Sequence, residues 1–326
     1  MEYRTGGSII RVFRPKVLTF GDKRLLGRIT MKMNQWAVCR CFKKIEERFD
    51  IVYAHFWTSG YNIMPCAIKY QLPLFVASGE DKIFFTQLIS SREVLQLKRV
   101  VRGVICVSTK NLKECIALNL VEKDTCIILP NAVNLDEFYR MEKSIVRGRL
   151  GYAVNDFIVV FVGRFVHRKG AKRVSDAIAK LKDDSIKSIF IGSTMSDETN
   201  DEEPNCSGIL FKGKLKHSDI PLYLNSADVF ILPSLAEGCS NSIVEALACG
   251  LPVISSDMEF NYDILNTSNA ILINPLDVEE IAKSIKYLKE DKSLCKQMSF
   301  SAIKTAQTLN YSDRVLKILE FIENKK

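Results

Sequence analysis

Short runs of β-branched and aromatic residues alternate with helical segments along both halves of the 326-residue chain. In the first half the expected strands cover residues 9–13, 51–54, 74–77, 104–107 and 125–129. In the second half they cover residues 157–163, 188–192, 228–233, 252–256 and 270–274. Such alternation predicts parallel sheets with helices on both faces. We therefore expect an α/β protein built from two doubly wound parallel-sheet domains.

The stretch 134–156 contains no strand pattern and separates the two series of strands, so a domain boundary is expected near residue 140. Residues 277–326 are helical almost throughout. We expect a first domain over 1–140, a second over 141–310, and a terminal helix over 311–326 that packs back on the first domain. Parallel sheets of this kind bind ligands at the carboxyl ends of their strands, which predicts a cleft there.

The composition is that of an ordinary globular protein, with 47% hydrophobic and 26% charged residues. No apolar run reaches the length of a transmembrane helix, and the charged N-terminus lacks the apolar core of a signal peptide. The ten cysteines lie in apolar segments without any C-x-x-C spacing. They predict reduced, mostly buried thiols in a cytoplasmic protein, and neither a disulfide framework nor a metal site.

The net charge of +8 is unevenly distributed. Residues 1–140 contain 22 Lys and Arg against 13 Asp and Glu, whereas the remainder contains 24 against 25. This basic first domain predicts an anionic partner, either a lipid-phosphate acceptor or the inner face of an anionic membrane. The alternative is a basic face that is merely solvated. Nucleic acid is not expected, because no nucleic-acid-binding module is present.

A cationic turn follows the expected strand at 157–163. It reads G-R-F-V-H-R-K-G over residues 163–170, with three cations between two glycines. Arg offers a fork of donors to phosphate oxygens and Lys offers a point charge, so the turn predicts a phosphate site. The alternative is a basic turn that simply ends at a glycine.

Two glutamates flank a Ser/Asn-rich turn in E-G-C-S-N-S-I-V-E, residues 237–245. A purely structural explanation is available for one of them, since Ser242 and Glu245 have the spacing of a capping box. The functional explanation gives the backbone amides at 238–242 to phosphate oxygens and the two carboxylates to hydroxyl groups on either side. A ligand with hydroxyls, a central diphosphate and further hydroxyls is a nucleotide sugar.

These motifs resemble those of a known family. G-R-x-x-x-x-K-G followed by E-G-x-x-N-x-x-x-E-A-x-A-C-G-x-P-V is similar to family 4 of the glycosyltransferases (glycosyl transferases group 1), retaining enzymes of GT-B fold. Three further segments also resemble the family: residues 128–134 with Phe138, residues 213–215, and residues 227–234. The resemblance covers roughly residues 50–326 and implies two Rossmann-like domains that face a cleft.

The resemblance implies a role for each matching residue. Arg164 and Lys169 bind the donor diphosphate, Glu237 contacts the donor sugar, and Glu245 holds the ribose hydroxyls. The remaining donor-binding residues that it implies are Gly163, Lys214, Leu215, Gly238, Cys239, Ser240, Asn241 and Ser242. No metal and no cofactor are implied, because the two cations stabilise the leaving diphosphate.

The implied activity is retaining transfer of a hexose from a UDP-, GDP- or ADP-linked donor to a lipid-linked or saccharide acceptor. Cell-surface polysaccharide synthesis at the cytoplasmic face of a membrane fits this activity. One alternative is a degenerate, non-catalytic member that binds nucleotide sugars or a partner. Another is a GT-B epimerase or phosphorylase, whose acid/base or cofactor residues the sequence lacks.

The first half departs from the family pattern. Ser78 stands where the family often has a histidine, which leaves His55 and Ser78 as the acceptor-side candidates. His167 and His217 are expected on the surface. The chain begins at a region that resembles the family's third strand, so we expect about 60 residues of the family's first domain to be absent, at about 30 residues per strand–helix unit. We therefore expect an incomplete first sheet and weak or absent turnover by this chain alone.

Overall fold

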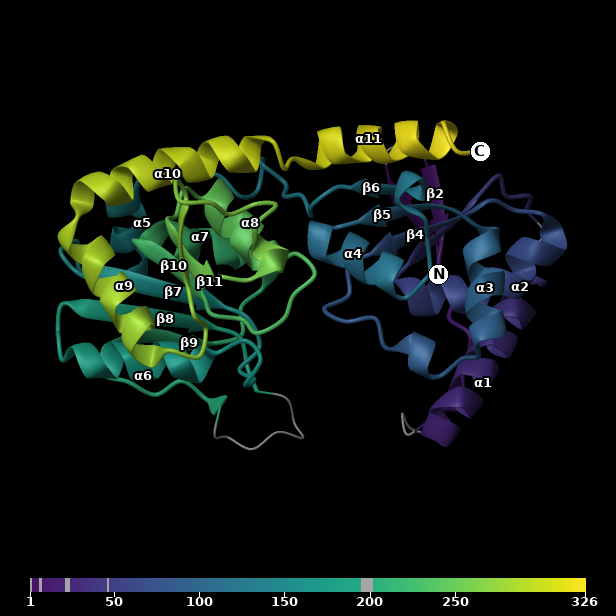
Figure 1. Cartoon of the computed structure of the whole chain (residues 1–326). Coiled ribbons are helices and arrows are strands. Elements are labelled where there is room, and N and C mark those ends of the chain that lie inside the picture. The colour runs from purple at the N-terminus through teal and green to yellow at the C-terminus, as the bar shows by residue number, and fades with distance from the viewer. Residues whose placement is uncertain (1, 6–7, 21–23, 46, 195–201) are drawn as a thin grey trace. The chain divides into compact units, whose positions relative to one another are not determined.

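The computed structural model describes residues 2–5, 8–20, 24–45, 47–194 and 202–326 (Figure 1). The chain forms two compact units, Met1–Ile128 with Ile318–Lys326, and Leu129–Lys317. The second unit begins before the boundary near residue 140 that the strand pattern suggests. Two hydrogen bonds account for this. The Val133 amide donates to the Leu309 carbonyl at 2.8 Å, and the Asn131 side chain donates to the Cys239 carbonyl at 2.9 Å.

The second unit contains a six-stranded sheet whose strands are all parallel. The strands are β7 (Phe157–Val162), β8 (Ile186–Ile191), β9 (Ile209–Gly213), β10 (Val229–Leu232), β11 (Val253–Ser256) and β12 (Ala270–Ile273). Five of the six match strands expected from the sequence. β9 was missed, because its short run contains a lysine and lies between two glycines.

The strand order in this sheet is β12-β11-β10-β7-β8-β9. The chain starts in the middle at β7, builds outward through β8 and β9, and then returns to the other side of β7 with β10. The connections therefore diverge between β7 and β10, which is the topological switch point where doubly wound sheets leave a crevice for ligands. The topology alone thus selects the loops that follow β7 and β10 as the candidate site.

Helices flank this sheet in packed pairs, with α6 against α9, α8 against α10, and α5 against α7 (Figure 1). Amphipathic helices with one buried apolar face, such as α6, supply these layers. The helices are α5 (Lys143–Leu150), α6 (Ala171–Leu181), α7 (Ile220–Ser226), α8 (Asn241–Ala248), α9 (Val278–Glu290) and α10 (Lys292–Gln307). α11 (Tyr311–Glu323) begins in the second unit and ends in the first.

The first unit contains a four-stranded parallel sheet of order β3-β4-β5-β6, in which neighbours in space are also neighbours in sequence. Its strands are β3 (Val52–His55), β4 (Leu74–Ser78), β5 (Val101–Cys106) and β6 (Cys126–Ile128), and its helices are α1 (Arg24–Phe42), α2 (Trp57–Tyr70), α3 (Ser91–Val100) and α4 (Thr109–Ala117). In the described part of the first unit, this order contains no switch point.

One predicted strand forms but does not pair with the strands that we expected. The segment expected at residues 9–13 is β2 (Ser8–Arg11), which pairs antiparallel with β1 (Glu2–Thr5) and does not join the parallel sheet. At the other end of the chain, the Phe321 ring contacts the Phe75 ring of β4 with centroids 6.4 Å apart.

All ten cysteines are free thiols. Within the ranges that the model describes, no helix combines the length and apolarity needed to cross a membrane.

Candidate donor-binding site

The turn after β7 is shaped by its two glycines. Gly170 is the N-cap of α6 and has φ +81°, a backbone conformation that glycine adopts without strain. A Cβ atom there would lie 2.5 Å from Nη2 of Arg173 and 2.9 Å from Pro233. Gly163 begins the turn, and its amide donates to the Ile191 carbonyl at 2.9 Å. The glycines thus let the turn lie close to the neighbouring loops.

Arg173 holds this turn in place, a role that the sequence did not reveal. Its guanidinium is buried and donates to three carbonyls from three loops: His167 at 2.8 Å, Pro233 at 2.8 Å and Pro275 at 2.7 Å. Burial lowers the pKa of Arg173 from its usual value. Because the loops after β7, β10 and β12 share one side chain, the geometry of the turn depends on Arg173.

Lys169 and Glu237 meet at the switch point. The Lys169 ammonium forms an ion pair with Glu237 Oε1, and only 15% of the Lys169 side chain and 10% of the Glu237 side chain is exposed. Ser234 donates to the same oxygen at 2.7 Å, and an Arg168 guanidinium nitrogen lies 3.7 Å from it. Two motifs far apart in sequence therefore form one charged cluster. Arg164 lies exposed at the beginning of the same turn.

The stretch 238–242 leads into α8. The helix begins at Asn241, and its N-cap Ser240 makes no side-chain capping hydrogen bond. The capping box of Ser242 and Glu245 is therefore not formed, because Glu245 lies one turn inside the helix. Asn131 instead fixes the entry, donating to the Cys239 carbonyl at 2.9 Å and to the Asn241 side chain at 2.7 Å. The first amides of a helix lack intrahelical acceptors, and an uncapped N-terminus suits an anion.

Cys239 and Gly238 are buried within this stretch, whereas Asn241 is exposed and Ser242 is half-buried. Burial raises the pKa of Cys239 to about 12, so its thiol stays protonated at neutral pH. Cys239 therefore offers a backbone amide and no thiolate.

Glu245 faces His217, a contact that the sequence did not reveal. His217 Nε2 lies 3.1 Å from Glu245 Oε1, and 14% of the Glu245 side chain is exposed. Burial raises the pKa of Glu245, although the hydrogen bond with His217 opposes that rise. His217 is 58% exposed, as a surface residue should be, but it is not without a partner. The second carboxylate of the stretch 237–245 therefore has its own supporting side chain.

Lys214 and Leu215 follow β9, at the same carboxyl edge of the sheet. Lys214 is exposed and Leu215 is half-buried. The Gly192 amide donates to the Gly213 carbonyl at 2.8 Å, and a Cβ at Gly192 would lie 1.9 Å from the Gly163 carbonyl oxygen. The ends of β7, β8 and β9 are thus packed tightly through glycines, which brings the predicted donor-binding residues Lys214 and Leu215 to the side of the cationic turn.

The acceptor-side candidates are different from each other. His55 is exposed at the end of β3, with its ring 5.4 Å from that of Tyr53. Ser78 is completely buried, and its hydroxyl donates to Glu80 Oε2 at 3.1 Å and accepts from Trp57 Nε1 at 3.2 Å. In the protein alone, Ser78 therefore has hydroxyl partners within the first unit, and its acceptor-side role stays a prediction.

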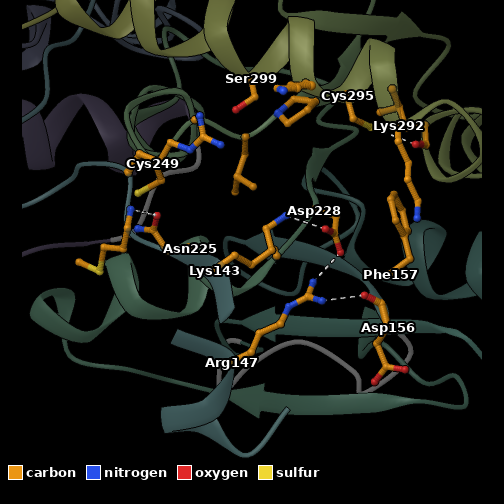
Figure 2. A pocket seen from close by; sticks show the side chains of 18 of the residues that line it. Lys143, Arg147, Asp156, Phe157, Asn225, Asp228, Cys249, Lys292, Cys295 and Ser299 are labelled. Carbon is orange, nitrogen blue, oxygen red and sulfur yellow. Dashed lines mark hydrogen bonds and ion pairs between the residues drawn. The ribbon is translucent and has the colours of Figure 1, made fainter. Parts of the chain in front are cut away.

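A cavity of about 670 Å³ lies at the opposite, amino-terminal edge of the six-stranded sheet (Figure 2). Asp228 dominates its wall, accepting from Arg147 Nη2 at 2.6 Å, from Lys143 Nζ at 2.6 Å and from the Ile158 amide at 2.7 Å. Arg147 is buried and also donates to the Ser226 carbonyl at 2.8 Å. This network joins α5 to the starts of β7 and β10, so it stabilises the sheet at the edge away from the candidate site.

Over the ranges that the model describes, no three His, Cys, Asp or Glu side chains gather closely enough to hold a metal ion.

Comparison with known proteins gives a family. The family model described as "Glycosyl transferases group 1" matches residues 142–305, about half of the chain. A Bacillus subtilis (strain 168) protein whose name assigns it to teichuronic acid biosynthesis, TuaC, is 29% identical over 255 residues, which are 76% of this chain and 64% of that protein.

Two further relatives are named as transferases to lipid-linked diphosphates. The N,N'-diacetylbacillosaminyl-diphospho-undecaprenol alpha-1,3-N-acetylgalactosaminyltransferase of Campylobacter jejuni is 26% identical over 65% of this chain and 57% of its own. The UDP-Gal:alpha-D-GlcNAc-diphosphoundecaprenol alpha-1,3-galactosyltransferase of Escherichia coli is 25% identical over 86% of this chain and 78% of its own. The chain thus spans less than two thirds of the first two of these three relatives.

Solved structures show the fold. Anabaena Alr3699/HepE in complex with UDP superposes with a TM-score of 0.76 and 19% identity, over 94% of this chain and 85% of that one. The sucrose-phosphate synthase of Thermosynechococcus elongatus superposes with a TM-score of 0.75 and 20% identity, over 91% and 78%. These likenesses and the two parallel-sheet units establish the GT-B fold.

Proposed function

The chain belongs to the glycosyl transferases group 1 family, and from this premise we propose that it transfers a sugar from a nucleoside diphosphate sugar to a lipid-linked or saccharide acceptor. The observation that carries the proposal is the buried Lys169–Glu237 ion pair at the switch point of the second sheet. A cation and a carboxylate are held there beside an uncapped helix N-terminus. These are the groups that a diphosphate and a sugar hydroxyl require.

The proposed donor site divides its ligand among these groups. Lys169 and Arg164 bind the diphosphate, and the amides around Cys239–Ser242 donate hydrogen bonds to further phosphate oxygens. Glu245 accepts from the ribose hydroxyls, and the backbone at Lys214 and Leu215 lines the base pocket. Glu237 is paired with Lys169 in the protein alone, and we expect it to exchange part of that pairing for a hydroxyl of the donor sugar once the diphosphate occupies the cation.

The proposed chemistry is transfer with retention and without a metal. The acceptor hydroxyl oxygen forms a bond to the anomeric carbon on the face that the nucleotide leaves, as the bond from that carbon to the diphosphate oxygen breaks. The acceptor proton passes to the departing phosphate oxygen, so no protein nucleophile is required. Lys169 and Arg164 stabilise the charge that develops on the leaving group, and such charge stabilisation is a major part of catalysis.

A lipid-linked acceptor accords with the surface of α1. Leu25, Ile29 and Trp36 are exposed along this helix at spacings of four and seven residues, which place them on one side. The basic residues Lys32 and Arg40 fall on the same side, and the Arg40 guanidinium lies 5.2 Å from the centre of the Trp36 ring. Helices that combine exposed apolar and basic residues bind anionic membrane surfaces. We therefore propose reversible membrane association through the first unit.

The donor assignment is tested by binding. Titration with UDP, GDP and ADP selects the best-bound diphosphate, and Lys169→Ala is expected to weaken its binding by about 1.5–3 kcal/mol, the scale of a charge-assisted hydrogen bond. Lys172→Ala is the matched control, because Lys172 pairs with Asp176 on the exposed side of α6. Unchanged affinity in the Lys169 variant, or in an Arg164/Lys169 double variant, would contradict the assignment. Binding without turnover would favour a non-catalytic role.

The membrane proposal has a separate test. Co-sedimentation with vesicles should increase with the fraction of anionic lipid and decrease between low and physiological salt. Trp36→Ala should weaken it, and Tyr287→Ala, an exposed aromatic of the second unit, should not. Sedimentation that ignores both lipid charge and salt would reject the proposal.

A further inference from the structure

His217 lies between two carboxylates. Its Nε2 is 3.1 Å from Glu245 Oε1, and its Nδ1 is 3.4 Å from Glu137 Oε1. The imidazole follows β9 at the start of a short 3₁₀ helix, His217–Asp219. Glu245 belongs to α8, and Glu137 belongs to the segment that precedes α5. Three segments that are distant in sequence therefore converge on one ring.

The ring is also oriented by packing. The buried Phe138 side chain contacts the imidazole edge-on, with ring centroids 5.1 Å apart and planes inclined by 60°. Phe138 is one of the residues through which the sequence resembles its family, and the resemblance gave no reason for an aromatic there. The structure gives one: Phe138 supports the ring that contacts Glu245.

Only a protonated imidazole satisfies both contacts. A neutral imidazole has one N–H donor, so one carboxylate would face a nitrogen lone pair, whereas imidazolium donates from both nitrogens. The hydrogen bond with Glu245 raises the pKa of His217, and the charge of Glu137 adds to the effect. Burial raises the pKa of Glu245 and thereby favours its protonated form. The imidazolium beside it has the opposite effect and favours the ionised carboxylate.

We propose that His217 is a positioning residue for donor recognition, holding Glu245 ionised and oriented so that its carboxylate accepts from the ribose hydroxyls. This inference rests on the proposed donor site, in which Glu245 binds the ribose. A carboxylate that is fixed at Oε1 presents Oε2 in one direction and loses little freedom when the ligand arrives. The ligand class concerned is any ribonucleotide, whatever its base.

A pH dependence follows, with a definite sign. Protonated His217 prevails below its raised pKa, and as pH rises through that pKa the cation beside Glu245 is lost, so ribonucleotide affinity should fall. In the described part of the chain, the titratable groups that face the pair are Glu137, which shares the imidazole, and Cys249, whose buried thiol has a raised pKa next to Glu245 and stays neutral. Glu245 and Glu137 therefore both raise the pKa of His217, with the hydrogen bond to Glu245 the larger cause.

The experiment compares ribose with dideoxyribose. The diphosphate that binds best among UDP, GDP and ADP and its 2′,3′-dideoxy counterpart, which lacks both hydroxyls that Glu245 would accept from, are titrated into wild type and His217→Gln from about pH 6 to about pH 9, which spans the titration of histidine. At low pH, His217→Gln should bind the ribonucleotide about fivefold more weakly than wild type does, the effect of one hydrogen bond, and the dideoxynucleotide less than about twofold more weakly. Because the diphosphate ionises in the same way in both titrations, the ratio of the wild-type and variant affinities at each pH is independent of that ionisation.

Two variants serve as controls. Glu137→Gln should leave low-pH affinity unchanged and move the loss of affinity to lower pH, because one of the two charges that raise the His217 pKa is removed. His167→Gln should change neither the affinity nor its pH profile, since His167 contacts Glu202 instead and its ring is 65% exposed. Thermal melting of each variant establishes that it is folded.

The outcomes separate this inference from the donor assignment. If binding of the ribonucleotide and the dideoxynucleotide is weakened equally by His217→Gln, or if the pH profile survives that substitution, His217 does not act through Glu245 and the inference is overturned. The donor assignment would stand in that case, since it depends on the Lys169 variant. If no nucleoside diphosphate binds wild type at any pH, both are overturned.

Discussion

Each of the two parallel sheets carries a largely buried carboxylate just beyond the end of a strand, and the two are held in opposite ways. In the first unit, Glu80 follows β4 and accepts from the Trp57 amide at 2.6 Å, the Gly79 amide at 3.0 Å and the Ser78 hydroxyl at 3.1 Å. In the second unit, Glu237 follows β10 and is held by the ammonium of Lys169 and the hydroxyl of Ser234. One carboxylate faces mostly backbone donors, and the other faces a cation.

The difference follows from topology. The strands of the first sheet run in sequence order, and the Trp57 amide that Glu80 accepts from belongs to the first residue of α2, so the carboxylate caps the helix that follows β3. The second sheet has a switch point between β7 and β10, where the connecting loops diverge. A carboxylate there meets a side-chain cation, and an ion pair can be exchanged for a ligand, whereas a helix cap cannot without unfolding the helix end.

The largest effect is expected at Glu80. Glu80→Ala removes the acceptor of two amides and one hydroxyl, and it should lower the free energy of unfolding by about 3 kcal/mol, the cost of leaving several buried donors without partners. Urea denaturation measures this. Glu122→Ala is the control within the same unit, since its side chain is 69% exposed and its loss should stay within about 0.5 kcal/mol. A small effect at Glu80 would remove the distinction drawn between the two carboxylates.

The ionisation of Glu80 sharpens the same test. Burial raises the pKa of Glu80 above its ordinary value, although its hydrogen bonds oppose the shift. A carboxyl with a raised folded-state pKa contributes its stability fully below the unfolded pKa and loses it as pH rises through the folded pKa. Wild type should therefore lose stability as pH rises from the unfolded-state pKa of Glu80 through its folded-state pKa, and Glu80→Gln should not show this loss. Glu80→Gln should also lower the free energy of unfolding less than Glu80→Ala does.

The second largest effect is expected at Gly170, where the cationic turn meets α6. Gly170→Ala places a Cβ 2.5 Å from the Arg173 guanidinium at φ +81°, so we expect about 2 kcal/mol of destabilisation from strain and displacement. Nucleoside diphosphate affinity should fall with it, because Arg173 fixes the turn. Gly148→Ala is the control: it lies inside α5 with no heavy atom within 4 Å of a new Cβ, so it should stabilise by about 0.8 kcal/mol. Equal effects at the two glycines would refute the role of the turn.

Glu237 comes next, and its test concerns turnover. Glu237→Gln keeps the shape but removes the charge, and kcat should fall at least about tenfold, or about 1.4 kcal/mol, if the carboxylate contacts the sugar in the transition state. Nucleoside diphosphate affinity should change by less than about threefold, because Lys169 is freed from its partner. Glu245→Gln should do the reverse, weakening the nucleotide more than kcat. If the Glu237 variant lost nucleotide affinity and kept its kcat, the roles proposed for Glu237 and Glu245 would be contradicted.

Sequence patterns predicted much of the second unit. Five of its six strands and its three C-terminal helices follow from hydrophobic periodicity, because buried parallel strands are continuous apolar runs. The motif residues Lys169 and Glu237 do meet. Their pairing could be anticipated because both follow strands whose carboxyl ends share one edge of a sheet.

The supporting residues could not be predicted in the same way. Arg173 and His217 act through tertiary contacts with segments far away in the sequence, and nothing in their local context marks them. Ser234 lies in a segment that resembles the family, but the resemblance did not give its hydroxyl a partner. Ser78 shows the same limit from the other side: its position in a family motif gave it an acceptor-side role, but the sequence did not show that its hydroxyl is buried between Trp57 and Glu80. The local sequence pattern predicts which helices and strands form, but it does not predict which polar groups form hydrogen bonds with one another.

The smallest expected effect compares the N-caps of two helices. Gly170 in the second unit and Phe56 in the first both have positive φ, but Phe56, at φ 68° and ψ 154°, is not a glycine. That region is strained for any residue with a Cβ. Phe56→Ala and Phe56→Gly both remove the half-exposed ring, so their difference isolates the backbone. Although glycine ordinarily costs unfolded-state entropy, Phe56→Gly should be about 1 kcal/mol more stable than Phe56→Ala in urea denaturation. If Phe56→Ala is the more stable of the two, the backbone at the end of β3 carries no strain, and the contrast between the two caps is lost.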